Sequence, residues 1–229
     1  MLFLLQGLIN DTGPIYTETD PERFIVEPWN AASAIVFIII AFYWLWKLRT
    51  KIRQHLFLFV SNCILLIGGI GGSLYHAFRS SEVYLIMDWL PILILTLAGS
   101  GFFFFKYTGK LWTGFAWIAG AFAAIGINYA AIANPDNPSR FSINFGYFLM
   151  AVTVLLPSIL LLIKQRWQNV QWVLFALISF ALALWFRIVD HEAWLPMGTH
   201  FLWHSFGALA NFGMFMYAHL VVEAEEQAV

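Results

Sequence analysis

The chain has 229 residues, of which 61% are hydrophobic and 11% charged, and its mean hydropathy is +0.74. This balance lies far outside that of soluble domains and predicts an integral membrane protein. Twelve Lys and Arg residues stand against thirteen Asp and Glu residues, and the formal charge of -1 excludes a basic surface for nucleic acid. The one cysteine, Cys63, can form neither an internal disulfide nor a cysteine-rich metal site.

Residues 1–30 are expected to form an acidic segment outside the membrane. A solvated segment is one interpretation of its carboxylates, and a calcium site is the other, because calcium takes six to eight oxygen ligands in a flexible loop. Glu27 stands directly before the first long apolar run, and we expect it to tie the segment to the helices. The five carboxylates after the first ten residues are those of Asp11, Glu18, Asp20, Glu22 and Glu27.

Seven apolar runs separated by short polar turns follow this segment. A helix needs about 20 apolar residues to cross a bilayer, so each run predicts one transmembrane helix. We therefore predict an all-α integral membrane protein with one seven-helix transmembrane domain over residues 31–221 and a tail at residues 222–229. The runs lie at residues 31–46, 55–76, 83–105, 111–133, 142–163, 170–189 and 199–221.

Basic residues predict the orientation of these helices. Loops rich in Lys and Arg stay on the cytoplasmic side, which places the N-terminus outside or in a lumen and the C-terminus in the cytoplasm. The short loops suit a bacterial inner membrane, with an endomembrane as the alternative. Eight of the twelve basic residues lie in the turns after the first, third and fifth runs, namely Lys47, Arg49, Lys51, Arg53, Lys106, Lys110, Lys164 and Arg166.

Ionisable side chains gather near the outer ends of three predicted helices. His76 ends the second helix, Asp88 lies near the start of the third, and His200 and His204 begin the seventh. A charged group at membrane depth costs about 2.5–3.5 kcal/mol on insertion scales, so each such residue needs a partner or a function. His200 and His204 are four residues apart and therefore lie on one face of a helix.

Three histidines on one ion leave the fourth tetrahedral position for water, which is typical of catalytic zinc. Zinc lowers the pKa of that water to about 7 and polarises a carbonyl, so an amide or ester could be hydrolysed there. Asp88 is the predicted general base. Ser73, one turn before His76, is the predicted donor to the developing oxyanion. The competing interpretation is that His200 and His204 are an ordinary pair without metal.

The other three histidines have less specific surroundings. His55 and His219 stand at the inner ends of predicted helices, and we expect them to be interfacial. His191 follows Asp190 in an outer loop. It either contacts a ligand of the metal, without binding the metal itself, or is simply solvated.

Four strings stand at the outer ends of the predicted helices: Glu27-Pro28-Trp29-Asn30, Gly71-Gly72-Ser73-Leu74-Tyr75-His76, Asp88-Trp89-Leu90-Pro91 and Pro196-Met197-Gly198-Thr199-His200-Phe201-Leu202-Trp203-His204. In these strings the chain resembles the alkaline ceramidase family, within the superfamily of seven-transmembrane metal-dependent hydrolases that includes adiponectin-receptor-like proteins. The resemblance spans nearly the whole chain. It implies hydrolysis of the linear amide C–N bond of ceramide, a membrane lipid substrate, to a sphingoid base and a fatty acid, with no obligatory protein partner evident.

The resemblance also implies the ligands of two metal ions. Zinc is expected on His76, His200 and His204, with Asp88 as the general base. Calcium is expected in the N-terminal segment. Its closest matching ligands are Glu18, Asp20, Glu27 and the backbone carbonyl of Tyr16.

Two positions depart from the family pattern. The family serine stands four residues before the helix 2 histidine, where this chain has Gly72, and Ser73 is about 100° further around the helix. Ile15 stands where an acidic calcium ligand is expected. Two other functions stay open: a hydrolase of another lipid amide or ester, and a seven-helix receptor or transporter with a structural metal.

Overall fold

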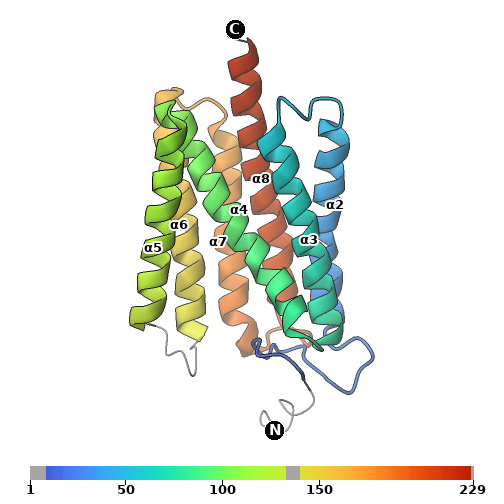
Figure 1. Cartoon of the computed structure of the whole chain (residues 1–229). Helices are drawn as coiled ribbons and strands as arrows, with labels where there is room; N and C mark the ends of the chain where they lie inside the picture. Colours follow the sequence, from blue (N-terminus) through green and yellow to red (C-terminus); the bar gives the residue numbers. More distant parts are fainter. Residues whose placement is uncertain (1–8, 133–139, 228–229) are drawn as a thin grey trace. The chain divides into compact units, whose positions relative to one another are not determined.

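The computed structural model describes residues 9–132 and 140–227, and these residues form helices joined by turns, with no strand among them (Figure 1). Pro28 opens the first of the helices, a position that suits proline because the first N–H of a helix has no intrahelical partner. The elements are α2 (Pro28–Leu48), α3 (Leu56–Phe78), α4 (Glu82–Thr108), α5 (Leu111–Ile132), α6 (Arg140–Lys164), α7 (Val170–Val189), the single turn η1 (Asp190–Glu192) and α8 (His200–Gln227).

Six of these helices are long and apolar enough to cross a membrane, and within α5 the stretch Leu111–Ile127 is apolar but shorter. Large apolar side chains are exposed along them, including Ile39 of α2 at 62% and Ile178 of α7 at 60%. In a soluble protein such surfaces would be covered, whereas lipid covers them in a membrane. The chain is thus a multi-pass membrane protein. Helix α8 runs on to Gln227, so the described part of the predicted tail continues this helix.

The chain divides into two compact units, one made of Met1–Ile92 with Leu174–Val229 and the other of Leu93–Val173. Helices α4 and α7 each contribute residues to both units. All four residues predicted as zinc ligands or general base belong to the first unit.

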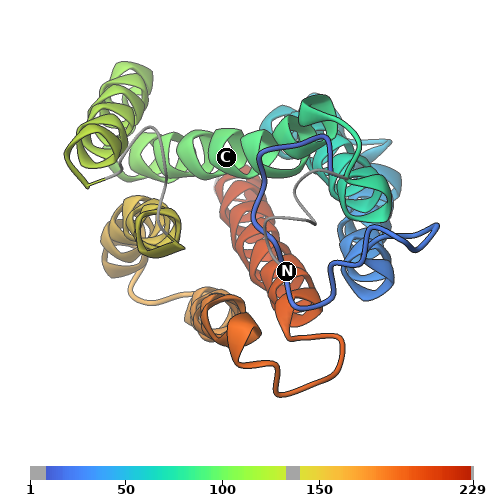
Figure 2. The same ribbon diagram turned by 90° about the horizontal axis from the view of Figure 1, so that it is seen from below.

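Within the first unit, α2 packs along both α3 and α8 (Figure 2). Trp44 of α2 is fully buried, and its ring lies 6.0 Å from that of Phe212 and 6.4 Å from that of Phe215 on α8. The start of α4 lies against α3 at Gly71. A Cβ atom at this glycine would lie 2.7 Å from the carbonyl carbon of Met87, so the two backbones approach closely.

In the second unit, α5 packs against α6. The ring of Phe104 on α4 stacks on that of Trp117 on α5 at 4.9 Å. Lys164, at the end of α6, donates to the carbonyl oxygens of Lys106 at 3.2 Å and Tyr107 at 2.6 Å. These bonds satisfy carbonyls at the C-terminal end of α4, where a helix leaves its last carbonyls unpaired and favours a cation.

The described part of the N-terminal segment lies across the ends of the helices in the first unit (Figure 2). The backbone N–H groups of Asn10, Val26 and Glu27 donate to carbonyls at the end of α3, at 3.1, 2.9 and 3.1 Å. The interpretation of this segment as simply solvated is wrong for Glu18 and Glu27, because both side chains are buried. Backbone pairing with α3 holds them there.

We expect Gly71→Ala to destabilise the protein, because its Cβ atom would collide with the Met87 backbone and force α3 and α4 apart. Overpacking of this kind costs about 1–3 kcal/mol, which thermal unfolding in detergent can measure. Gly99→Ala in α4 is the matched control, since a Cβ atom at Gly99 meets nothing within 4 Å. Equal unfolding temperatures for the two variants would contradict the close approach.

Candidate metal centre

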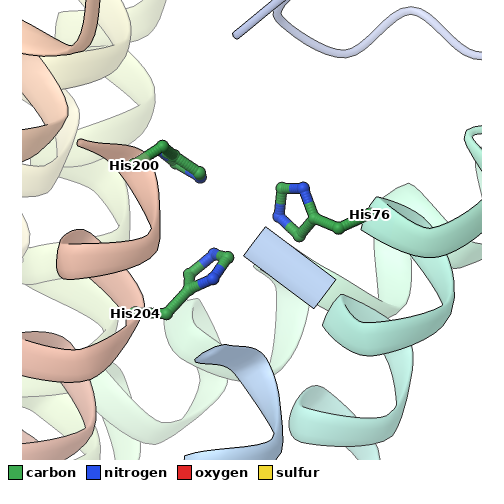
Figure 3. A group of neighbouring side chains, drawn as sticks. All are labelled: His76, His200 and His204. Atoms are coloured by element: carbon green, nitrogen blue, oxygen red, sulfur yellow. The ribbon is translucent and has the colours of Figure 1, made fainter. Parts of the chain in front are cut away.

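The structure brings His76, His200 and His204 together at one end of the first unit. One ring nitrogen from each lies within 4.8 Å of the others, and all three side chains are buried. Figure 3 shows the rings converging on a common space, one from α3 and two from successive turns of α8. Tetrahedral zinc with bonds of about 2.0–2.1 Å needs nitrogens about 3.4 Å apart, so small side-chain rotations would close the site.

Two of the ring nitrogens have no hydrogen-bond partner within the described residues. They are Nε2 of His76 and Nδ1 of His200, and both are fully buried. A buried polar atom without a partner costs about 1–3 kcal/mol. A metal ion would satisfy both nitrogens at once, so the residues present fit a zinc ion.

The remaining nitrogens of His76 and His204 are held by protein groups. Nδ1 of His76 lies 2.5 Å from Oε2 of Glu27. Nδ1 of His204 lies 2.9 Å from the Ser33 hydroxyl and 3.1 Å from the Asn30 carbonyl. Metal-binding histidines almost always donate their second nitrogen to a carboxylate or carbonyl, which fixes the tautomer and the ring orientation. This pattern favours Nε2 as the ligand atom in both residues.

Glu27 has partners on both carboxylate oxygens. Besides His76, it accepts hydrogen bonds from Thr19 at 2.6 Å, from Arg79 at 2.5 Å and from the Asn30 amide at 3.2 Å. Burial alone would raise the pKa of Glu27, but the charge and hydrogen bond of His76 and the charge of Arg79 lower it to about 2. The carboxylate is therefore ionised at neutral pH and joins the N-terminal segment to α3, as expected.

Arg79 supplies the positive charge of this network. It follows the end of α3 in the left-handed conformation, with φ of 47°, and its side chain is buried. Its Nε and Nη2 donate to both oxygens of Asp11, at 2.9 and 2.8 Å. Burial by itself would lower the pKa of Arg79, but hydrogen bonding to Asp11 and the charge of Glu27 raise it. The sequence offered one signal for this role, an arginine three residues after His76.

Asp190 fixes the start of α8 and therefore the position of His200. Its Oδ1 accepts the backbone N–H groups of Thr199 at 2.7 Å and His200 at 2.9 Å, and its Oδ2 accepts that of Thr17 at 3.0 Å. A carboxylate at a helix N-terminus satisfies unpaired N–H groups and interacts favourably with the helix dipole. His191 itself is exposed, so of its two interpretations the structure favours the solvated one.

Asp88 lies against α3 one helical turn before His76. A Cβ atom at Gly72 would stand 2.6 Å from Oδ1 of Asp88, so a side chain at position 72 would displace the carboxylate. This contact gives a physical reason for glycine at this position. The Ser73 hydroxyl donates to the Gly69 carbonyl of its own helix at 2.9 Å. The oxyanion role of Ser73 stays a prediction.

Glu18, one of the expected calcium ligands, caps helix α2. Its two carboxylate oxygens accept the backbone N–H groups of Trp29 at 2.6 Å and Asn30 at 2.9 Å. Burial raises the pKa of Glu18, and these two hydrogen bonds oppose the increase. Both oxygens therefore already have partners at the N-terminus of α2.

Like Glu18 and Glu27, the expected calcium ligands Asp20 and Tyr16 also have partners in the protein. Asp20 forms an ion pair with Arg23 at 2.9 Å and accepts the N–H of Glu22 at 3.1 Å. The carbonyl of Tyr16 accepts the N–H of Thr19 at 3.2 Å, and the Tyr16 ring stacks on His200 at 3.7 Å. Calcium binding stays a prediction, since any cation would have to replace these contacts.

No protein-family model matches the chain, and no curated protein matches it either.

We expect Asp190→Ala to lower stability by about 1–2 kcal/mol, because it removes the cap of α8 and the contact with Thr17. Since His200 follows this cap directly, zinc affinity should fall as well. Thermal unfolding and zinc titration of the detergent-solubilised protein measure both effects. Glu192→Ala is the control, as Glu192 is an exposed neighbour paired only with exposed His191. Identical behaviour of the two variants would show that the cap does not position the site.

Proposed function

We propose that this protein is a zinc-dependent intramembrane amidase, which hydrolyses ceramide-like lipids to a sphingoid base and a free fatty acid. The observation that carries the proposal is the group of three buried histidines, in which Nε2 of His76 and Nδ1 of His200 have no partner among the described residues. His76 and His204 are oriented through their Nδ1 atoms. Three protein ligands leave one tetrahedral position open, as in catalytic rather than structural zinc sites. When bound, zinc supplies Lewis-acid activation of water and of the scissile carbonyl.

Asp88 is the proposed acid and base. Its carboxylate lies beside α3 near His76, and no hydrogen bond of this side chain is found in the described part of the chain, which leaves it free to accept a proton from water. The same carboxyl group can then donate that proton to the departing amine nitrogen. In this proposal water would lose its proton to the Asp88 side chain rather than to bulk solvent.

Glu27 and Arg79 are proposed to position the ligands. The Glu27 carboxylate accepts the Nδ1 proton of His76, so Nε2 carries the lone pair that a metal needs. Arg79 balances the charge of Glu27 at 2.5 Å, which keeps the carboxylate ionised in a buried place. Neither residue contacts the substrate in this proposal.

We further propose that all seven helices span the membrane, with the N-terminus outside or in a lumen. His200 and His204 lie in the first two turns of α8, about 6 Å apart along its axis, so the site is close to the outer surface. Trp29 is half exposed, and its ring lies 5.8 Å from that of Phe201 beside the site. This apolar border suits a two-chain lipid that enters sideways from the outer leaflet.

The zinc site is tested by metal content. His200→Ala and His204→Ala should each lose about one equivalent of zinc, because each removes one of only three protein ligands. Elemental analysis of the purified variants measures this loss. His191→Ala is the control, since it removes an exposed histidine outside the group. Unchanged zinc in both ligand variants would show that the group is not a metal site.

The reaction is tested by fatty acid release from a long-chain ceramide in detergent or liposomes. Wild-type protein should cleave it and should be much poorer on a short, soluble N-acyl amine. Asp88→Asn should keep its zinc and lose about 10²–10⁴ in rate, because the amide cannot accept the proton. If zinc-loaded wild type cleaves other lipid amides or esters instead, the substrate is wrong. If it cleaves none, a receptor or transporter with a structural metal becomes the better hypothesis.

A further inference from the structure

A second group of ligand-bearing side chains lies at the other end of the first unit. It consists of His55, His219 and Glu223, and one ligand atom from each lies within 4.8 Å of the others. His55 directly precedes α3, whereas His219 and Glu223 lie one turn apart in the second half of α8. In Figure 1 the connection from α2 to α3 and the C-terminal half of α8 lie at the end opposite the N-terminal segment.

Both histidines are buried within the first unit. His55 is 1% exposed and His219 is 4% exposed, so protein side chains cover both rings. Their expected position at the membrane interface stays a prediction. The connection from α2 to α3 places His55 against α8, and the two rings lie 4.7 Å apart between centroids. Such a tertiary contact is not visible in the linear pattern.

The nitrogens of these rings have few protein partners. Neither nitrogen of His55 nor Nδ1 of His219 has a hydrogen-bond partner in the described residues. Nε2 of His219 lies 3.4 Å from Oε1 of Glu223, which is longer than a usual hydrogen bond of about 2.7–3.2 Å. Burying imidazoles this way is costly without a ligand, because each unsatisfied polar atom has lost its contact with water.

The walls of the group are compatible with a small cation. The Trp44 ring packs edge-on against His219 at 5.3 Å and closes one side. Lys51 lies 3.5 Å from Oε1 of Glu223 and competes for this carboxylate. Its side chain is half exposed, so it can turn to solvent when another cation takes its place. The Glu223 side chain is one-third exposed and offers a path of entry.

We propose that His55, His219 and Glu223 form a second metal site, for a divalent transition metal of the Zn²⁺ class. Two imidazoles and one carboxylate are a donor set that zinc accepts, with a fourth position left for water. Calcium and magnesium prefer oxygen ligands only, so two nitrogen donors disfavour them. The metal would join the connection between α2 and α3 to α8 through side chains that are far apart in sequence.

This proposal does not depend on the amidase hypothesis, because none of its residues belongs to the first site. The test uses the full chain in detergent, stripped with a chelator, then incubated with zinc, desalted and analysed for metal. Wild type should hold two equivalents. His219→Ala, Glu223→Gln and His204→Ala should each hold one, and His204→Ala combined with Glu223→Gln should hold none.

Glu226→Gln is the matched control, since it removes one negative charge from the same end of α8 without removing a ligand. It should still hold two equivalents. In the His204→Ala background, added zinc should raise the unfolding temperature, because a ligand of the folded state stabilises it. Glu223→Gln should abolish this increase and Glu226→Gln should keep it.

Two results would refute the proposal of a second metal site. One is a Glu223→Gln or His219→Ala protein that holds as much zinc as wild type. Another is a His204→Ala protein that binds no zinc and shows no zinc-dependent increase in unfolding temperature. If only the His200 and His204 variants lose metal, the result supports the first site and refutes the second. The failures of the two proposals are therefore distinguishable.

Discussion

The buried carboxylate of Glu27 is the contact on which the metal centre depends. It accepts hydrogen bonds from Thr19 in the N-terminal segment, Asn30 in α2, and His76 and Arg79 at the end of α3. An ionised carboxylate without partners would be very costly in this place, and removing one partner from a buried ion pair typically costs about 3–5 kcal/mol. The N-terminal segment, α2 and α3 therefore stay together. If any of them moved away, a charge would be left without a partner in an apolar environment.

Two other carboxylates extend this constraint to the helices that carry or orient the histidines. Glu18 caps α2, whose first two turns hold Asn30 and Ser33, and Asp190 caps α8, whose first two turns hold His200 and His204. Helix N-termini attract negative charge, so each cap lies where the backbone favours it. These contacts give partners to the buried carboxylates of the N-terminal segment: Glu27 faces the guanidinium of Arg79, and Glu18 faces the N-terminus of α2.

The convergence of His76, His200 and His204 could be predicted, because spacing and depth in apolar helices are readable from the sequence alone. The membrane helices could be predicted for the same reason. Arg79 and Asp190 could not, since their roles depend on contacts with Asp11 and Thr17 that lie 68 and 173 residues away in the chain. The sequence does not predict the burial of His55, because this histidine lies in a polar turn. Its burial depends on the packing of α8 against that turn.

Helix α8 carries ligands of both proposed metal sites, and this restricts how it can pack. About 19 residues separate the centres of its two ligand pairs, or about 28 Å along the axis, close to the hydrocarbon thickness of about 30 Å. Between the pairs, the small residues Ala208, Ala210 and Gly213 are buried in the unit, which allows close helix contact. A shift of α8 by one residue would turn its side chains by about 100° and break both sites together. Metal bound at the C-terminal half of α8 would therefore hold the register that His200 and His204 at its start require.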